Sequence, residues 1–253
     1  GKTRAIYSCD SRSYFTFDYL LKPVEAVWRN HRVLLDPGRE MQSIFYKRLS
    51  REGPARFMLD FDDFNSQHTL EAMRICIEEV CAGAPDDVLD WAMSSWSNMH
   101  VHWAEGEEMR CERMCGTLPS GHRATSFVNT ILNAAYCSIV AGELYDQVNS
   151  RHTGDDVIFS GDQESLSRIA EAFTQSNFRA NRMKQSIGPK MGEFLRVAFD
   201  HRGAVGYAPR AIASLVSGNW VTETRADPRA YVENLLRGIW TVVSRSRTYS
   251  WGQ

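Results

Sequence analysis

The chain has 253 residues, of which 43% are hydrophobic and 24% charged, and this composition excludes a disordered tail or a fibrous repeat. Its 29 Lys and Arg against 31 Asp and Glu give a formal net charge of −2, which excludes a uniformly basic protein that coats nucleic acid. No apolar run approaches the ~18 residues of a membrane span, so we expect a soluble, intracellular protein without a membrane partner.

The first half of the chain is predicted to be mainly helical, with one buried strand. The spacing of apolar residues predicts helices over residues 14–30, 40–51, 66–82 and 86–96. The apolar run 55–61 suits a short buried strand that ends in acidic residues. Residues 99–116 have no clear period, but Glu105-Gly106-Glu107 is a typical hairpin turn.

The second half alternates longer helices with short strands. Helices are predicted over residues 123–144, 163–178 and 228–243, the last beginning at the capping pair Asp227-Pro228. The turn Thr153-Gly154-Asp155-Asp156 leads into the apolar run 157–159, which predicts a hairpin with acid at its tip. Residues 193–199 alternate as one strand. Because no βαβ rhythm is present, we expect an α+β fold, an antiparallel sheet flanked by helices.

The cysteines raise two readings that stay open. Six cysteines scattered over a chain of this size fit reduced thiols better than a disulfide framework. His100, His102, Cys111 and Cys115 could hold zinc, although their spacing is loose. We favour the other reading, in which these are ordinary buried cysteines and surface histidines.

Two acidic clusters carry the chemistry. Asp60 opens the first cluster at the end of a strand, and Asp155 and Asp156 form the second at a hairpin tip. Two Mg²⁺ ions need such oxygen ligands, and they can activate an attacking hydroxyl and neutralise a leaving oxygen in phosphoryl transfer. A calcium loop at Asp60 fails because Asn65 stands where the turn needs Gly. Taken singly, Asp62 and Asp63 are solvated turn acids.

A glycine loop that enters a helix forms the third constellation. It reads Ser120-Gly121-His-Arg-Ala-Thr125-Ser-Phe-Val-Asn129. Thr125 and Asn129 lie one helical turn apart, so the hydroxyl and the amide share a face on which they can read a ribose or a base edge.

In this order the three constellations resemble motifs A, B and C of viral RNA-dependent RNA polymerases. The spelling Asp60-Phe-Asp-Asp-Phe-Asn-Ser-Gln-His68 resembles the polymerases of totivirus-like double-stranded RNA viruses, as do Gly1-Lys-Thr-Arg-Ala-Ile-Tyr7 before it and Gly192-Glu-Phe-Leu-Arg196 after it. The motifs cover roughly residues 1–200. Because the chain begins without Met inside the first motif, we expect a piece of a longer polypeptide.

The resemblance implies a right-hand polymerase palm with partial fingers and the start of a thumb. It places partial fingers at 1–55, palm at 56–84 and 118–200, a fingers insertion at 85–117 and the beginning of the thumb at 201–253. It also implies that Asp60 and Asp155 bind two Mg²⁺ or Mn²⁺ ions, with Asp156 in support.

The remaining site residues are assigned by the same resemblance. Motif F supplies Lys2 and Arg4 for the incoming triphosphate, and motif E supplies Arg196 near the primer end. Motif B supplies Ser120, Gly121, Thr125 and Asn129 for the template and the ribose hydroxyl. Lys184 is the candidate for the motif D general acid, for which Arg182 and Lys190 compete.

Asn65 departs from many polymerases of single-stranded RNA viruses, which have Asp at this position. The totivirus-like form of this motif has Asn at this position, and an amide can still hydrogen-bond a 2′-hydroxyl. We therefore keep Asn65 as a ribose-sensing residue.

The predicted function is an RNA-directed RNA polymerase that replicates and transcribes a double-stranded RNA genome. The expected partners are an RNA template and product strand, ribonucleoside triphosphates and a viral capsid protein, in the virion interior or the host cytoplasm. A reverse transcriptase is one alternative, which the Ser-Gly-x-x-x-Thr-x-x-x-Asn helix disfavours. A non-catalytic RNA-binding or capsid-associated relic is the other, which the grouped acids disfavour because they repel phosphate.

Overall fold

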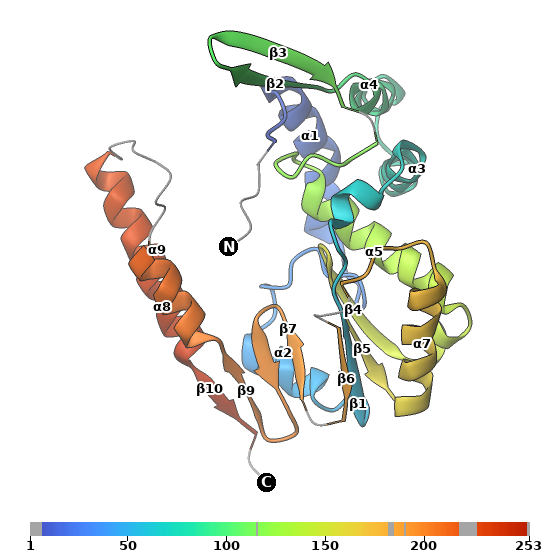
Figure 1. Ribbon diagram of the computed structural model, residues 1–253, viewed down its shortest axis with the longest axis vertical. Helices are drawn as coiled ribbons and strands as arrows, with labels where there is room; N and C mark the ends of the chain where they lie inside the picture. Colours follow the sequence, from blue (N-terminus) through green and yellow to red (C-terminus); the bar gives the residue numbers. More distant parts are fainter. Residues whose placement is uncertain (1–6, 115, 182–184, 190, 218–226, 252–253) are drawn as a thin grey trace.

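The computed structural model describes residues 7–114, 116–181, 185–189, 191–217 and 227–251 (Figure 1). Its helices are α1 (Ser11–Val27), α2 (Gln42–Leu49), the 3₁₀ helix η1 (Phe64–Gln67), α3 (Leu70–Val80), α4 (Asp86–Ser97), α5 (Thr125–Ala141), α6 (Leu144–Gln147), α7 (Gln163–Gln175), α8 (Ala208–Ser217) and α9 (Pro228–Ser246). Its strands are β1 (Ala55–Leu59), β2 (His100–Glu105), β3 (Glu108–Arg113), β4 (Asn149–Thr153), β5 (Asp156–Gly161), β6 (Ser186–Gly188), β7 (Gly192–Phe194), β8 (Val197–Phe199), β9 (Gly203–Gly206) and β10 (Thr248–Ser250).

The central sheet has the strand order β4-β5-β1-β6, and each neighbouring pair is antiparallel. Side chains of β1 alternate between its two faces, as the period of a strand requires. Phe57 and Leu59 enter the main hydrophobic core, whereas Met58 packs against a second, smaller core on the opposite face. Both faces of the sheet are therefore covered, and the apolar run predicted at 55–61 is a buried strand.

Helices cover one face of this sheet, and α2 with a strand hairpin covers the other. Phe159 of β5 packs on the side of α5 and α7, with Phe127, Ile169 and Phe173 in the same core. Ile158, the next residue towards the strand's start, packs on the other side with Phe45 of α2. Figure 1 shows α5 and α7 on one side of the sheet. The α+β fold expected from the sequence is confirmed.

The predicted single strand at 193–199 is wrong, because these residues form the hairpin β7–β8. Phe194 pairs with Val197, which leaves Leu195 and Arg196 as a two-residue turn. Both turn residues have positive φ, 50° for Leu195 and 65° for Arg196, which is the backbone of the hairpin turn that matches strand twist. Neither is Gly or Asn, so the usual turn signal was missing from the sequence.

A second antiparallel sheet, β10-β9-β8-β7, leads from this hairpin to the last two long helices. The helices α8 and α9 pack against each other and stand apart from the central sheet in Figure 1. Asp227 caps α9 by accepting a hydrogen bond from the backbone N–H of Ala230, as the Asp227-Pro228 pair predicted. Neither β9, β10 nor α8 was predicted from the sequence.

The N-terminal elements α1, α3 and α4 lie on the far side of α5 from the second sheet (Figure 1). The hairpin turn predicted at Glu105–Glu107 is confirmed, and it joins β2 to β3. The helix predicted at 66–82 instead begins at Leu70, because Thr69 accepts a hydrogen bond from the N–H of Ala72 and caps the helix there. The residues before Thr69 form η1.

Within the described residues, none of the helices combines the length and the apolar character that crossing a membrane requires.

Candidate active site

The antiparallel pairing of β1 with β5 brings the two acidic clusters to one end of the central sheet. The last pair of this ladder is Leu59 with Val157. Asp60 follows Leu59 and Asp156 precedes Val157, so the two carboxylates stand next to each other across the strands. Asp155 is the turn residue just before Asp156. Two motifs that lie about a hundred residues apart in sequence thus meet at one point.

Asp156 has a pKa raised to about 6, and the causes locate its neighbours. The largest cause is desolvation by the surrounding protein, even though solvent still reaches the side chain. Repulsion by Asp155 and then by Asp60 raises the pKa further, while Arg196 lowers it. This is the behaviour of crowded carboxylates that repel one another, and a bound cation would relieve the repulsion.

The backbone of the acidic turn is held from beneath by α5. Gly154, at φ 60°, occupies the turn position that favours glycine. Its N–H donates to Thr130 Oγ1 at 2.8 Å, and the Asn133 amide donates to its carbonyl at 3.1 Å. Asn133 Oδ1 in turn contacts His152 Nδ1 at 3.0 Å. Thr130, Asn133 and His152 are buried. The only sequence signal for their role is the polarity of Thr130 and Asn133 on the apolar helix α5 and of His152 on β4.

The donor set suits a hard divalent cation that keeps further ligands from water or substrate. Carboxylate oxygens are what Mg²⁺ prefers, and Mg²⁺ is usually held by one or two carboxylates together with phosphate oxygens. Among the described residues, no group of three or more His, Cys, Asp or Glu side chains is placed to hold a metal ion by itself. The carboxylates of Asp60, Asp155 and Asp156 are the kind of ligand that such an ion takes, and its remaining ligands would come from phosphate groups or water.

Of the four candidate zinc ligands, two are in contact within the described part of the chain. His102 and Cys111 are cross-strand partners in the exposed hairpin β2–β3, and His102 Nε2 lies 3.7 Å from Cys111 Sγ. His100 is the cross-strand partner of Arg113, at the end of the ladder farthest from the turn. Cys115 lies outside the described residues.

Asn65 and Asn129, the two candidates for ribose recognition, are in direct contact. The Asn129 amide donates to Asn65 Oδ1 at 2.8 Å, and the Asn65 amide donates to the carbonyl of Leu118 at 2.9 Å. Asn129 is buried, whereas Asn65 is half-buried. The contact joins the segment after the first acidic cluster to the helix that follows the glycine loop. Sequence spacing alone could not show this, because the partners are 64 residues apart.

The glycine loop is placed by α5 and by the N-terminal segment. Thr125 donates its hydroxyl to the carbonyls of Pro119 and His122, at 2.6 and 2.8 Å, so this hydroxyl shapes the loop. Gly121 donates its N–H to the carbonyl of Tyr7, and Ser120 Oγ accepts from the N–H of Tyr7 at 3.4 Å. Ser120 is exposed. Of the four motif B candidates, Thr125 thus holds the loop together and Asn129 reaches Asn65.

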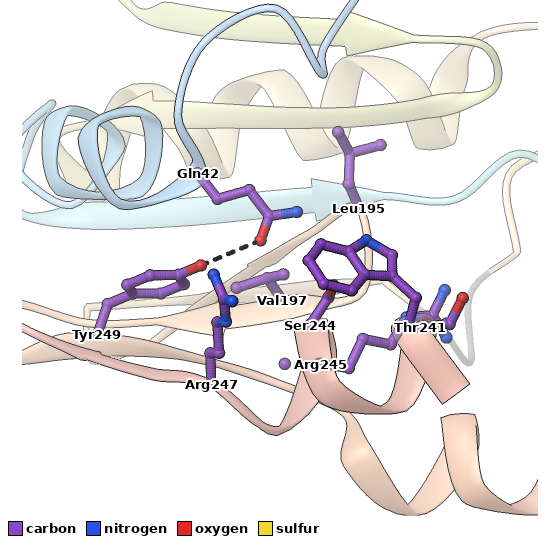
Figure 2. Close-up of a pocket in the computed structure, with 10 residues that line it drawn as sticks. Gln42, Leu195, Val197, Thr241, Ser244, Arg245, Arg247 and Tyr249 are labelled. Carbon is purple, nitrogen blue, oxygen red and sulfur yellow. Dashed lines mark hydrogen bonds between the residues drawn. The ribbon is translucent and has the colours of Figure 1, made fainter. Parts of the chain in front are cut away.

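A cationic pocket lies beside the β7–β8 turn that carries Arg196. It has a volume of about 190 Å³, and its lining includes Trp240, Ser244, Arg245, Arg247 and Tyr249 (Figure 2). Tyr249 donates its hydroxyl to Gln42 Oε1 at 3.4 Å, and the guanidinium of Arg247 lies 5.9 Å from the centre of the Trp240 ring.

The arginines around this pocket repel one another. Desolvation and then the charges of Arg196 and Arg210 lower the pKa of Arg245. In the part of the chain that the structure describes, no carboxylate forms an ion pair with Arg196, Arg210, Arg245 or Arg247. Guanidinium groups next to aromatic rings and hydroxyls are suited to a phosphate group with an attached base or sugar.

Three of the sequence-predicted site residues cannot be placed. These are Lys2, Arg4 and Lys184, which lie outside the described residues. Arg182 and Lys190, the alternatives to Lys184 as the motif D general acid, also lie outside them. The motif F and motif D assignments therefore stay predictions.

Comparison with known proteins identifies the family. The family model described as viral RNA-directed RNA-polymerase matches residues 1–220. The chain is 37% identical over 250 residues to the probable RNA-directed RNA polymerase of Leishmania RNA virus 1 - 1 (isolate Leishmania guyanensis), covering 94% of this chain and 28% of that protein. It is 40% identical over 240 residues to the corresponding protein of Helminthosporium victoriae virus-190S, covering 90% of this chain and 28% of that protein.

A solved structure shows the same fold. The RNA-dependent RNA polymerase of a human picorbirnavirus superposes with a TM-score of 0.72 at 15% identity, covering 97% of this chain and 49% of that one. The chain thus spans about 28% of the length of these curated relatives and about half of the solved structure. Members of this family generally use divalent metal ions. The motif order, the meeting of the acidic clusters and these comparisons agree, and the chain belongs to the viral RNA-directed RNA polymerases of the totivirus-like kind.

Proposed function

We propose that this chain is the catalytic part of an RNA-directed RNA polymerase that joins ribonucleotides on an RNA template. The observation that carries the proposal is the meeting of Asp60, Asp155 and Asp156 at one end of the central sheet. Polymerase relatives that match most of the chain support it. No observation favours a reverse transcriptase or a non-catalytic relic.

Asp60, Asp155 and Asp156 would hold two Mg²⁺ or Mn²⁺ ions. When bound, such a pair supplies charge neutralisation for an in-line displacement at the α-phosphate, with pyrophosphate as the leaving group. The contribution of the chain is to present the carboxylates on rigid strands and to hold the turn at Gly154 in place through Thr130 and Asn133. In the metal-free chain Asp156 is partly protonated near pH 6, so metal binding requires the release of that proton.

The other contacts would select and hold the RNA. Asn65 and Asn129 would contact the ribose, and Ser120 and Gly121 would border the template. The pocket at Arg245 and its neighbours would take a phosphate of the product strand, since its guanidinium groups have no carboxylate partner among the described residues. Lys2, Arg4 and Lys184 would serve the incoming triphosphate and its leaving group, as the motifs predict.

We propose the following division of the chain. Residues 1–55 and 85–117 belong to the fingers, 56–84 and 118–200 to the palm, and 201–253 to the beginning of the thumb. The central sheet is built from β1 of the first palm segment and β4, β5 and β6 of the second, and α8 and α9 of 201–253 stand apart from it, which supports the division. The second sheet joins β7 and β8 of the palm segment to β9 and β10 of 201–253. The polymerase would act in the virion interior or the host cytoplasm, in association with a viral capsid protein.

Template-directed synthesis tests this proposal. The intact protein that contains these residues is incubated with Mg²⁺ or Mn²⁺, a homopolymeric RNA template and each labelled ribonucleotide in turn. We expect incorporation only of the complementary nucleotide, a switch of that preference when the template is changed, and loss of incorporation when the metal is chelated. Incorporation that is independent of template would contradict the proposal.

A further inference from the structure

A continuous chain of hydrogen bonds runs from a backbone carbonyl beside the glycine loop to a buried tyrosine. The amide of Asn65 donates to the carbonyl of Leu118, and the amide of Asn129 donates to Asn65 Oδ1. Asn129 Oδ1 lies 2.7 Å from His68 Nε2, and His68 Nδ1 lies 3.2 Å from the hydroxyl of Tyr136. His68 and Tyr136 belong to neither of the acidic clusters nor to the glycine loop.

The donor and acceptor of each of these hydrogen bonds are determined from one end of the series. The carbonyl of Leu118 can only accept, so Asn65 must present its amide there and its oxygen to Asn129. Asn129 must then present its amide to Asn65, which leaves its oxygen facing His68. An oxygen requires a donor, so His68 carries its proton on Nε2. Its bare Nδ1 accepts the hydroxyl proton of Tyr136.

Packing keeps His68 in this state. Its side chain is 2% exposed and lies between the rings of Phe64 and Tyr136, whose centroids are 4.6 and 5.7 Å away. Burial lowers the pKa of His68 despite the hydrogen bond from its ring to Asn129. The ring is therefore neutral at physiological pH, with a single favoured tautomer. Burial also raises the pKa of Tyr136 to about 12, so its hydroxyl keeps the proton that it donates.

We propose that His68 and Tyr136 are positioning residues for sugar selection, and this inference rests on the proposed function. They hold the amides of Asn129 and Asn65 in one orientation. In that orientation each amide retains one N–H and Asn65 Oδ1 retains a lone pair, groups that a ribose 2′-hydroxyl can use and a deoxyribose cannot. Without the donor at His68, the Asn129 amide can rotate and exchange its N–H for oxygen. A site built to bond a hydroxyl would then discriminate less.

The tautomer of His68 can be measured in the intact protein that contains these residues. The ¹⁵N chemical shifts of the imidazole ring distinguish a protonated Nε2 from a bare one. We expect a protonated Nε2 and a bare Nδ1 at pH 7, and we expect the Tyr136→Phe variant to keep this tautomer because Asn129 Oδ1 still requires a donor. A bare Nε2 in the wild-type chain would overturn the proposal, whether or not the protein incorporates nucleotides.

The functional readout is the ratio of kcat/KM for a ribonucleotide to kcat/KM for its 2′-deoxy counterpart, measured with the intact protein. We expect His68→Leu to lower this ratio about tenfold, the scale of one lost hydrogen bond to a buried group. His68→Gln, which keeps a donor, should retain most of the ratio. Tyr145→Phe is the matched control, because it removes another buried Tyr–His bond, to His152 Nε2 at 3.0 Å, and should leave the ratio unchanged.

The outcomes separate this inference from the proposed function. A purely structural role for His68 would lower the rates with both sugars equally and leave their ratio unchanged, which would overturn the inference while the polymerase activity stands. A wild-type protein that incorporates neither nucleotide would overturn the proposed function, and the tautomer measurement would still decide whether the hydrogen-bond chain has the stated direction.

Discussion

Asp60 and Asp156 stand next to each other at the end of the β1–β5 ladder, and the charge of Asp60 helps to raise the pKa of Asp156 to about 6. This relationship decides how the metal-free chain responds to pH. An unfolded Asp has a pKa near 3.8, so the folded chain holds an extra proton between about pH 4 and 6. The contribution of this carboxyl to stability is therefore favourable at low pH and is lost as the pH rises through 6.

The first prediction follows from that proton. Mn²⁺ must displace it, so we expect the affinity of the chain for Mn²⁺ to fall as the pH is lowered through about 6. Calorimetry at pH 5 and pH 7.5 measures this change. In the metal-free Asp60→Asn variant, a ¹³C NMR titration should show a lower pKa for the Asp156 carboxyl, and an unchanged pKa would contradict the inferred proximity.

The second prediction concerns the support of the acidic turn by α5. Thr130→Val removes the acceptor of the Gly154 N–H while keeping the size of the side chain, and it should weaken Mn²⁺ binding about tenfold. The matched control is Thr174→Val on α7, which loses the same kind of bond to a carbonyl four residues earlier but touches no part of the turn. Equal Mn²⁺ affinities in the two variants would show that Thr130 does not position the carboxylates.

A third prediction addresses the cationic pocket. Arg245→Ala should weaken RNA binding and reduce the slope of log K against log salt by about one, because one phosphate contact is lost. Arg229→Ala is the control on the same helix, since Arg229 is exposed and already paired with Glu233. Fluorescence anisotropy with a labelled RNA over a range of salt concentrations gives both slopes, and indistinguishable slopes would exclude the pocket as an RNA contact.

The fourth prediction concerns the buried ion pair between Arg151 of β4 and Glu52, whose side chains are 4% and 12% exposed. Arg151→Met leaves the Glu52 carboxylate buried without its partner, and should lower the free energy of unfolding by about 3–5 kcal/mol. Adding Glu52→Leu to that variant should restore much of the loss. The exposed pair of Arg48 with Glu40 provides the comparison, where Glu40→Gln should cost less than about 1 kcal/mol in urea unfolding.

Local patterns predicted most of the elements that build the central sheet. Apolar periodicity located α5 and α7, and the acidic turn at Gly154 was correctly read as a hairpin tip. The β7–β8 turn was missed because Leu195 and Arg196 adopt positive φ without the usual Gly or Asn, held there by the pairing of Phe194 with Val197. The start of α3 was missed because the cap at Thr69 overrides a continuous apolar period.

For the candidate site as well, the sequence predicted individual residues, whereas their contacts are seen only in the structure. Motif order identified Asp60, Asp155 and Asp156, but only the strand pairing shows that they meet. The motifs also pointed to Asn65 and Asn129 separately. The partners that orient them, His68 and Tyr136, are joined through contacts between residues more than 60 positions apart, which no local pattern records.

The central claim is that Asp155 belongs to a metal-dependent polymerase centre, and template-directed incorporation by matched Asp→Asn variants of the intact protein tests it most directly. Asp155→Asn should abolish incorporation of the complementary ribonucleotide with either Mg²⁺ or Mn²⁺. Asp63→Asn should retain it, because Asp63 is exposed and its positive φ of 48° suits Asn equally well. Wild-type incorporation by Asp155→Asn would contradict the account.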